Sequence, residues 1–366
     1  MHTIHINLPN RSYDVLVANG LLSQAGAHIS TLAAQPRRIA IISDETVAGH
    51  HAEKLTTSLQ SVGYKTTLHL VPAGEASKSM ASVESLSRAM IRDGHDRYSS
   101  VVALGGGVVG DLAGFVAAVF YRGVPYIQIP TTIVSQVDSS VGGKTGVNTP
   151  EGKNLIGAFH QPALVLVDPE TLRTLPDREY REGFAEAIKH AAIRDADMLD
   201  DLAALDPEKR DVPPALIARN IAIKARIVEA DETETLDIRA LLNFGHTIGH
   251  GIEAAVPYGQ LLHGEAIALG IRAALDLSMR HAGLSESDAS MVLSLLENFR
   301  LPLVLDEAIT TDTVIEKIAR DKKFTAGTIR FVVLTQAGTA AVTRDITTDD
   351  LRNAIDRLRS QPFRLK

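Results

Sequence analysis

The chain has 366 residues, and its 37 basic and 44 acidic side chains give a formal net charge of −7. Apolar residues make up 45% and charged residues 22%, a globular composition that excludes wholesale disorder and fibrous repeats. There is no cysteine, so disulfides, thiolate metal sites and cysteine nucleophiles are excluded. The negative charge argues against general nucleic-acid binding, and the length predicts about two domains.

Neither a secretory signal nor a membrane span is expected. The amino-terminal sequence MHTIHINLPNRSYDVLV has no cationic region followed by an apolar core. The most apolar stretch, residues 112–120, is far shorter than the roughly 20 residues that a spanning helix needs. These observations predict a cytoplasmic protein.

The first half of the chain alternates between strand-like and helix-like segments. Residues 3–8 and 13–17 alternate apolar and polar side chains, which predicts a β-hairpin. Short apolar runs predict buried parallel strands at residues 38–42, 65–71, 100–104, 124–129 and 163–167. Helical spacing appears between them at residues 47–62 and 78–93. This alternation predicts a doubly wound α/β sheet.

The second half is mainly helical in pattern. Helices are expected at residues 179–193, 214–229, 239–256 and 263–281, and only residues 329–334 have a strong β pattern. The change of character, together with Asp-Pro and Leu-Pro-Asp sequences, predicts a domain boundary within residues 168–177.

A glycine-rich loop follows the predicted strand at residues 100–104. It comprises Gly105, Gly106, Gly107, Val108, Val109, Gly110 and Asp111. Such a loop at the start of a helix lets backbone N–H groups approach a pyrophosphate. The acid expected about 20 residues later for a ribose is missing, since Pro130 stands there, so a tight strand-to-helix turn is an equal alternative. Asp44 and Glu75 follow strands and could bind adenosine hydroxyls or cap helices.

Three histidines lie within a short glycine-flanked stretch. His246 and His250 are four residues apart, so they share one helix face, and His263 opens the next predicted helix. Neutral imidazole binds divalent metals, and local spacing suggests His246 and His250 as a ligand pair. The sequence argues against a zinc peptidase, because Thr247 stands where the H-E-x-x-H motif of those enzymes has glutamate. The cluster favours a metal site over surface or capping histidines.

Two further segments carry charged residues that could act chemically. Glu186 and Lys189 are helix neighbours, and locally an exposed ion pair is favoured over a metal ligand beside a substrate-binding ammonium. Residues 130–154 form a long run of small and hydroxylic residues in which Lys144 and Lys153 stand among glycines. An irregular segment of this kind is typical of function, and its lysines suit phosphate.

Taken in order, these motifs resemble those of the 3-dehydroquinate synthases of the shikimate pathway. The matching sequences are GGGVVGD, YRG, PTT, SQVDSSVGGK, GKN, EAIK, NFGHTIGH, HGE and DKK. The resemblance implies a Rossmann-like NAD-binding domain over residues 1–174 and a helical domain over residues 175–366 that binds metal and substrate. It also implies a homodimer, bound NAD and one divalent metal, zinc or cobalt.

The resemblance also assigns roles to residues. The metal ligands would be Glu186, His246 and His263, and His250 would act on the substrate side or as a proton relay. The catalytic set would be Lys153, Lys189, Arg239, Asn243 and His250. Substrate would contact Arg122, Asp138, Asn154, Lys224 and either Lys322 or Lys323. NAD would contact Asp44, Glu75, Lys78, the loop from Gly105 to Asp111, Thr131, Thr132, Lys144, Lys153, Thr171, Leu172, Arg173 and Thr174.

The implied reaction converts 3-deoxy-D-arabino-heptulosonate 7-phosphate to 3-dehydroquinate and phosphate. It combines transient oxidation by NAD, β-elimination of phosphate, re-reduction and an intramolecular aldol step. A related cyclase acting on glucose 6-phosphate or sedoheptulose 7-phosphate, a metal-dependent polyol dehydrogenase and a non-catalytic nucleotide-binding regulator are the alternatives. Arg239 and Asn243 favour the shikimate substrate, and the lysines favour a phosphorylated one.

Overall fold

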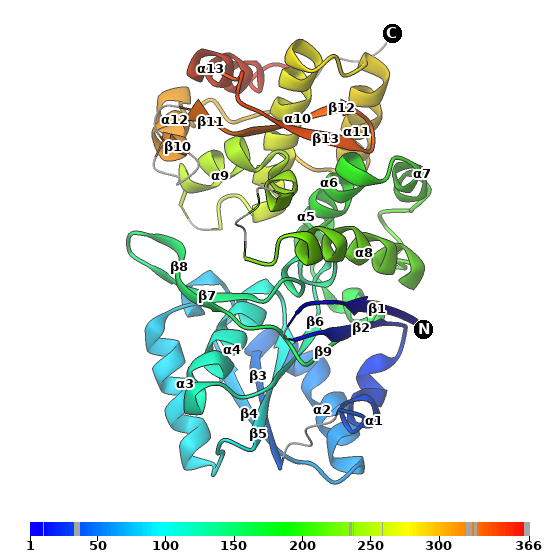
Figure 1. Ribbon diagram of the computed structural model, residues 1–366, viewed down its shortest axis with the longest axis vertical. Helices are drawn as coiled ribbons and strands as arrows, with labels where there is room; N and C mark the ends of the chain where they lie inside the picture. The colour runs from blue at the N-terminus through cyan, green and yellow to red at the C-terminus, as the bar shows by residue number, and fades with distance from the viewer. Residues whose placement is uncertain are drawn as a thin grey trace. The chain divides into compact units, whose positions relative to one another are not determined.

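The computed structural model describes residues 1–9, 11–32, 37–233, 236, 238–257, 259–319, 324–325 and 328–361. They form two compact units (Figure 1). The first comprises Met1–Leu175 and Asp211–Thr233, and the second comprises Pro176–Arg210 and Glu234–Lys366. The division differs from the expected one at 174/175 by one residue at that boundary and in residues 211–233, which belong to the first unit.

The first unit is built on a seven-stranded sheet. The spatial order of its strands is β1 (His2–Ile6), β2 (Tyr13–Val17), β9 (Leu164–Val167), β6 (Tyr126–Pro130), β5 (Ser99–Gly105), β3 (Arg38–Asp44) and β4 (Lys65–Val71). Only β1 is antiparallel to its neighbour, so the predicted hairpin and the predicted parallel strands are both confirmed. The chain adds β4 on one side of β3 and β5 on the other, and this reversal makes a topological switch point between β3 and β5.

Helices cover both faces of this sheet because its central strands are apolar on both sides. Ile39 and Ile41 of β3 pack toward α1 (Ala25–Ile29) and α2 (Glu45–Ser61). Ala40 and Ile42 point to the other face, toward α3 (Met80–Arg92) and α4 (Gly107–Val119). The alternation follows from the two-residue period of a strand, and it confirms the doubly wound α/β prediction.

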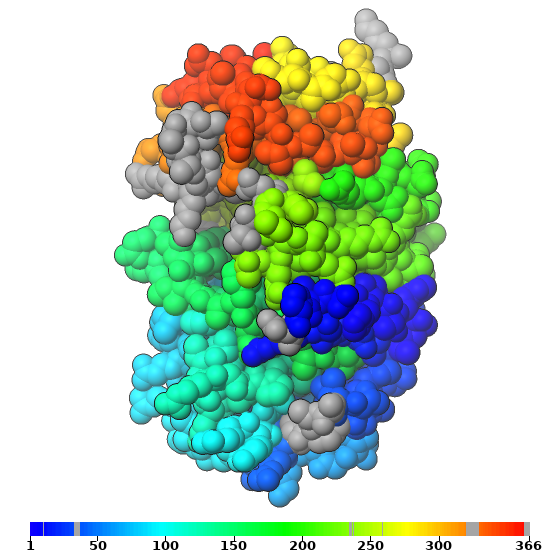
Figure 2. All heavy atoms as spheres, viewed as in Figure 1, coloured from blue at the N-terminus to red at the C-terminus, as the bar shows by residue number. Residues whose placement is uncertain are grey.

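Helix α8 (Pro214–Ala230) covers the edge of the first unit. It packs against β1, β2 and the π-helical turn Ser135–Ser139. Figure 2 shows the blue amino-terminal strands directly beside the yellow-green atoms of this helix. Because its apolar face is buried on these elements, α8 belongs with the sheet although it follows residues 176–210 in the chain.

The expectation of an irregular segment over residues 130–154 is wrong for most of its length. The segment contains the π-helical turn and an antiparallel hairpin, β7 (Lys144–Thr149) and β8 (Gly152–Phe159). Gly114 of α4 allows β7 to pack closely, since a Cβ at this position would lie 2.5 Å from Cγ2 of Thr145.

In the part of the second unit that the structure describes, helices predominate, as predicted, and there are two short pairs of antiparallel strands. Its helices are α5 (Asp177–Glu182), α6 (Phe184–Arg194), α7 (Asp197–Ala203), α9 (His246–Ala254), α10 (His263–His281), α11 (Glu286–Asn298), α12 (Thr311–Ala319) and α13 (Thr348–Arg357). Its strands are β10 (Phe324–Thr325), β11 (Thr328–Ile329), β12 (Phe331–Gln336) and β13 (Thr339–Thr343). None of the described helices is long and apolar enough to cross a membrane.

Two predicted helices of this unit are interrupted. The helix expected at 179–193 is divided at Gly183 into α5 and α6. The helix expected at 239–256 consists of the 3₁₀ segment Ile238–Asn243 and α9, separated by Gly245 at φ +77°. A left-handed residue cannot continue a right-handed helix, so the chain turns at this glycine.

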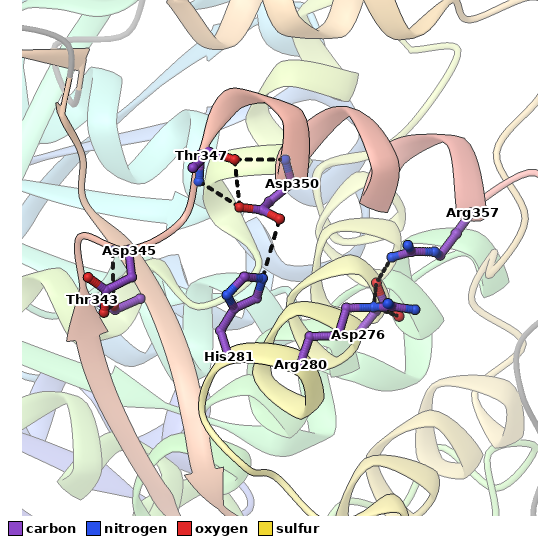
Figure 3. A network of polar contacts seen from close by, with 8 residues as sticks. All are labelled: Asp276, Arg280, His281, Thr343, Asp345, Thr347, Asp350 and Arg357. Carbon is purple, nitrogen blue, oxygen red and sulfur yellow. Dashed lines mark hydrogen bonds and ion pairs between the residues drawn. The ribbon is translucent and has the colours of Figure 1, made fainter.

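The long helix α10 is fixed at its carboxyl end by α13. Arg357 lies 2.6 Å from a carboxylate oxygen of Asp276, and His281 lies 3.4 Å from Asp350. Asp350 also accepts the backbone N–H of Thr347, so the same carboxylate caps α13 (Figure 3). This network ties the last turns of α10 to the carboxyl-terminal helix.

Candidate functional site

The nucleotide-binding candidates gather at the switch point of the first unit's sheet. Asp44 is the last residue of β3, and Gly105 is the last residue of the neighbouring strand β5. In open α/β sheets, ligands bind outside the carboxyl ends of the strands where the strand order reverses. The expected pyrophosphate loop therefore lies where this fold places a ligand.

The glycine loop is closely packed, and side chains at several positions would clash. A Cβ on Gly105 would lie 2.6 Å from Cβ of Val109, and one on Gly106 would lie 2.9 Å from Cγ2 of Thr132. Helix α4 begins at Gly107, so its first free N–H groups face the loop. Thr131 donates its backbone N–H to the carbonyl of Gly105 at 3.0 Å, which joins the ends of β5 and β6.

Three expected cofactor residues, Lys78, Asp111 and Asp44, form strong polar contacts with their neighbours. Lys78 Nζ lies 2.5 Å from Oδ2 of Asp111, and the lysine is only 5% exposed. Burial raises the pKa of Asp111, and the charge of Lys78 opposes this rise. Asp44 accepts the N–H of Val47 at 2.9 Å, so it caps α2, as the alternative interpretation of the sequence expected.

Asn148 is a residue that the sequence reasoning did not single out. Its amide donates to Oε1 of Glu75 at 2.7 Å, and its Oδ1 accepts the backbone N–H of Asn154 at 3.0 Å. Its own backbone N–H donates to the carbonyl of Lys78 at 2.9 Å. Asn148 thus joins candidate cofactor residues to a candidate substrate residue on the β7–β8 hairpin.

Gln136 was also missed, and it links three segments of the cofactor candidates. Its Nε2 lies 3.2 Å from the carbonyl of Pro130, 3.1 Å from that of Asp168 and 3.1 Å from Oγ1 of Thr171. Asp168 in turn caps the 3₁₀ segment Pro169–Thr174, which contains Leu172, Arg173 and Thr174. Gln136 is a buried amide in the π-helical turn. Such turns have no distinct sequence pattern, so the sequence did not point to this residue.

The substrate and catalytic candidates of the first unit, together with the cofactor candidate Lys144, lie on four elements, counting the β7–β8 hairpin as one. Lys224 Nζ lies 2.7 Å from the carbonyl and 2.9 Å from Oδ1 of Asp138, which joins α8 to the π-helical turn. Lys144 and Lys153 are exposed on the β7–β8 hairpin. Arg122 is exposed and has φ +68°, a left-handed conformation that is unusual for a side-chain-bearing residue.

The second unit brings the three expected metal ligands together. Oε1 of Glu186 on α6 lies 3.3 Å from Nε2 of His246 and 3.4 Å from Nε2 of His263. These histidines are the first residues of α9 and α10. Both carboxylate oxygens of Glu186 are buried, and the groups that face them are the ionisable side chains of Lys189, His246 and His263. One carboxylate and two imidazoles that converge in this way fit a divalent cation.

Hydrogen bonds at the far side of each imidazole orient these rings. Nδ1 of His246 donates to the carbonyl of Phe244 at 3.1 Å, and Nδ1 of His263 donates to Oε2 of Glu253 at 3.1 Å. Each bond leaves Nε2 directed at Glu186, the arrangement found around protein-bound metals. Glu253 was not predicted, although it lies three residues after His250 on the same helix.

The ionisation of the three groups also suits a cation. Burial lowers the pKa of His246 to about 4, helped by the charge of Lys189, so this imidazole is neutral. Burial acts against charge on His263 as well, but hydrogen bonds to Glu186 and Glu253 raise its pKa to about 10. The pKa of Glu186 is well below its usual range despite burial, because Lys189 and the histidines favour the carboxylate. A metal would replace the proton on His263.

Further expected residues surround this trio. His250 is half-buried, and its ring centroid lies 5.0 Å from that of His246 and 5.8 Å from that of His263. Lys189 forms an ion pair with Glu186 in which both side chains are at least 98% buried, so the expectation of an exposed pair is wrong. Buried Arg239 and half-buried Asn243 lie in the 3₁₀ segment that packs on α6. Lys322 and Lys323 lie outside the described residues.

Comparison with solved structures identifies the class. ValA, a 2-epi-5-epi-valiolone synthase from Streptomyces hygroscopicus with NAD+ and Zn2+ bound, is 31% identical with a TM-score of 0.87, covering 96% of this chain and 98% of its own. A 2-deoxy-scyllo-inosose synthase complexed with carbaglucose-6-phosphate, NAD+ and Co2+ is 25% identical with a TM-score of 0.85, covering 97% and 99%. Glycerol dehydrogenase from Schizosaccharomyces pombe shares the fold alone, at 18% identity and a TM-score of 0.64, covering 94% and 88%. The fold is that of the sugar phosphate cyclases, and the first two of these structures contain NAD+ and a divalent metal.

Sequence comparison narrows this class. Residues 68–182 match the 3-dehydroquinate synthase N-terminal model, and residues 183–324 match the C-terminal model. A 3-dehydroquinate synthase from Symbiobacterium thermophilum is 43% identical over 360 residues, covering 97% of this chain and 100% of the relative. One from Azotobacter vinelandii is 43% identical over 360 residues, covering 97% of each. The chain belongs to the 3-dehydroquinate synthase family.

Proposed function

We propose that the chain converts 3-deoxy-D-arabino-heptulosonate 7-phosphate to 3-dehydroquinate and inorganic phosphate, with NAD and one zinc or cobalt ion. The observation that carries the proposal is the meeting of Glu186, His246 and His263 at one buried carboxylate oxygen. This donor set supports a catalytic metal in a chain whose family is already established.

The first unit would bind the cofactor. The glycine loop and the start of α4 offer backbone N–H groups to a pyrophosphate, and Lys78 adds a positive charge held in place by Asp111. Asp44 ends β3, Glu75 begins the 3₁₀ segment that follows β4, and both would bind ribose hydroxyls. When bound, NAD would take up a hydride and return it in the same turnover, while the divalent cation would polarise substrate oxygens.

The residues of this chain would bind, orient and move protons. Arg122, Lys153 and Asn154 would hold the phosphate of the substrate, whose carbon–oxygen bond breaks after the adjacent carbon loses a proton. Arg239 and Asn243 would hold the carboxylate and hydroxyl groups. Lys189 would donate to a substrate oxygen, and His250 would relay a proton to or from it. The closing aldol step needs no added group, because the carbonyl and the enolate belong to one molecule.

The proposal is tested by supplying the purified protein with the heptulosonate phosphate, catalytic NAD and zinc. Phosphate release and NADH absorbance are recorded together, and the product is identified by mass spectrometry. We expect stoichiometric phosphate, dehydroquinate and no accumulating NADH. Accumulation of NADH without phosphate would instead place the chain with the polyol dehydrogenases.

A matched substrate gives the control for specificity. Sedoheptulose 7-phosphate carries the same phosphate but lacks the carboxylate that Arg239 and Asn243 would bind. We expect it to be turned over much more slowly than the heptulosonate phosphate. Faster turnover of sedoheptulose 7-phosphate would assign the chain to a different cyclase activity.

The proposal includes two features of the whole protein. The family resemblance implies a homodimer, and we also propose a cytoplasmic location. Sedimentation equilibrium tests the first, and a monomer at assay concentration would contradict it. Fractionation of the source cells tests the second.

A further inference from the structure

The helical segment that carries Glu186 also contacts the start of α10 at two earlier positions. Arg178, Glu182 and Glu186 follow one another at intervals of four residues. Gly183, which joins α5 to α6, keeps right-handed helical angles of φ −63° and ψ −24°. Although the helix is divided at Gly183, all three side chains contact the start of α10, so they form one row.

Each member of this row meets a successive residue at the start of α10, in reverse order. Arg178 lies 2.6 Å and 2.7 Å from the two carboxylate oxygens of Glu265. Glu182 accepts the backbone N–H of Gly264 at 2.5 Å. Glu186 lies 3.4 Å from His263. The contact between the proposed metal ligands Glu186 and His263 is therefore the third of three successive contacts between α5–α6 and the start of α10.

The middle contact allows almost no movement. A Cβ on Gly264 would lie 1.9 Å from the backbone carbonyl oxygen of Glu182, so the two backbones touch and only glycine fits. The carboxylate of Glu182 also satisfies an N–H group that a helix leaves free in its first turn.

The first contact fixes the segment that leads into α10. Besides Glu265, the guanidinium of Arg178 binds the carbonyls of Gly259 at 3.3 Å and Gln260 at 2.8 Å. Glu265 itself accepts the backbone N–H of Leu262 at 2.8 Å. Arg178 of the short helix α5 thus binds residues on both sides of His263 in the sequence, namely Gly259 and Gln260 before it and Glu265 after it.

We propose that Arg178 and Glu182 are positioning residues that set the placement of His263 relative to Glu186, and so the affinity of the site for zinc. Among the described residues, neither forms a hydrogen bond or ion pair with the side chain of Glu186, His246 or His263, and neither is among the residues that the family motifs assign. The inference rests on the proposed metal site and deepens it. Partners of this kind contribute about 10- to 100-fold in metal affinity.

The test measures zinc affinity by competition with a chromophoric chelator, on the full chain and without turnover. We expect Arg178→Gln and Glu182→Ala each to bind zinc about 10- to 100-fold more weakly. Glu182→Gln keeps an acceptor for the N–H of Gly264, so we expect it to restore most of the affinity. Because glutamine also matches glutamate in size, unfolding of the zinc-free variants is needed to separate a general loss of packing from a loss of zinc affinity.

Two variants serve as matched controls. Arg181→Gln removes an ion pair of the same helix with Glu208, and Arg357→Gln removes the pair with Asp276 near the other end of α10. We expect both to bind zinc as tightly as the parent chain. Unfolding of the zinc-free variants in urea is measured alongside, so that affinity is compared among folded chains.

The outcomes separate this inference from the proposed metal site. If Arg178→Gln and Glu182→Ala bind zinc as tightly as the parent while His246→Ala does not bind it, the positioning role is wrong and the site stands. If Glu182→Gln is as weak as Glu182→Ala, the proposed backbone contact is wrong. If His246→Ala keeps the zinc, the metal site itself is wrong.

Discussion

Lys78 Nζ lies 2.5 Å from Oδ2 of Asp111, and this ion pair joins the residue preceding α3's cap to the second turn of α4. Both helices cover the same face of the sheet, and Asp111 ends the glycine loop. Burial raises the pKa of Asp111, and Lys78 is the main group that opposes this effect. The pair therefore couples the folding of this face to the loop that would hold a pyrophosphate.

Replacing Lys78 by Met should destabilise the first unit and abolish NAD binding. Removing one member of a buried ion pair leaves an uncompensated charge and costs about 3 kcal/mol or more. Lys78→Met with Asp111→Asn should regain much of the stability without regaining NAD affinity, as measured by urea unfolding and NAD titration. Lys54→Met removes only an exposed contact of 3.9 Å with Glu170 and should change little. Equal NAD affinity in Lys78→Met and the parent would remove Lys78 from the cofactor site.

The histidines can be separated by metal content. His246→Ala should lose both tightly bound zinc and turnover, because its Nε2 faces Glu186. His250→Ala should keep zinc and lose turnover, since its proposed role is on the substrate side. Metal content after dialysis is measured by plasma mass spectrometry. Zinc loss in His250→Ala with retention in His246→Ala would reverse the assignment.

Gly270 lies where α10 passes closest to the start of α9. A Cβ at this position would lie 2.0 Å from the carbonyl oxygen of Gly245 and 2.7 Å from the backbone nitrogen of Gly249. Gly270→Ala should therefore destabilise the protein by about 3 kcal/mol, since neither backbone can move freely. Gly49→Ala in α2 is the control. Its Cβ meets nothing within 4 Å, and alanine should stabilise the helix by about 0.5–1 kcal/mol. Thermal unfolding measures both, and equal effects would contradict the close crossing.

A buried histidine pair in the first unit should make stability depend on acid pH. The hydroxyl of Thr67 lies 2.8 Å from Nε2 of His69 and 2.7 Å from Nε2 of His95. A hydroxyl has one proton to donate, so at most one of the two rings can accept from it, and a ring that accepts must be unprotonated at that nitrogen. Burial lowers the pKa of His95 to about 4, helped by His69 and Arg38, although Asp93 and Asp96 oppose the shift.

The sign of the pH effect follows from this lowered pKa. An unfolded histidine titrates near pH 6.5, so between pH 6.5 and about 4 the unfolded chain binds more protons. The free energy of unfolding should fall by up to about 3 kcal/mol as the pH falls through this window, and stay constant above it. His95→Gln should flatten the dependence, whereas exposed His2→Gln should not. An unchanged pH profile in His95→Gln would show that another group controls acid stability.

Much of the fold could be predicted from local pattern. The apolar runs of β3 and β5 have no competing interpretation, and the predicted helix at residues 263–281 matches α10 at both ends. The helix breaks at Gly183 and Gly245 were missed, because glycine within a helical pattern can be tolerated and only the packing decides. The β7–β8 hairpin was missed because glycine, asparagine and lysine interrupt any alternation.

The candidate site was harder to predict from local pattern than the fold. Glu186 and Lys189 suggest an ordinary exposed pair, and only the folded chain buries them beside two histidines from other helices. His250 has the better local spacing to His246, yet the ring that shares the carboxylate oxygen with His246 is that of His263. Local spacing could not reveal which distant residues meet, whereas the family motifs carried that information.

The interleaved order of the two units has a consequence for synthesis on the ribosome. The chain passes between the units at residues 175/176, 210/211 and 233/234. When residue 175 has been made, the sheet of the first unit has all its strands but lacks α8, the helix that covers β1 and β2. The apolar face of that edge stays uncovered until residue 230 has emerged, by which time part of the second unit is already made. Neither unit can therefore be obtained by cutting the gene once, and a nascent chain shorter than this has an unprotected edge for chaperones to bind.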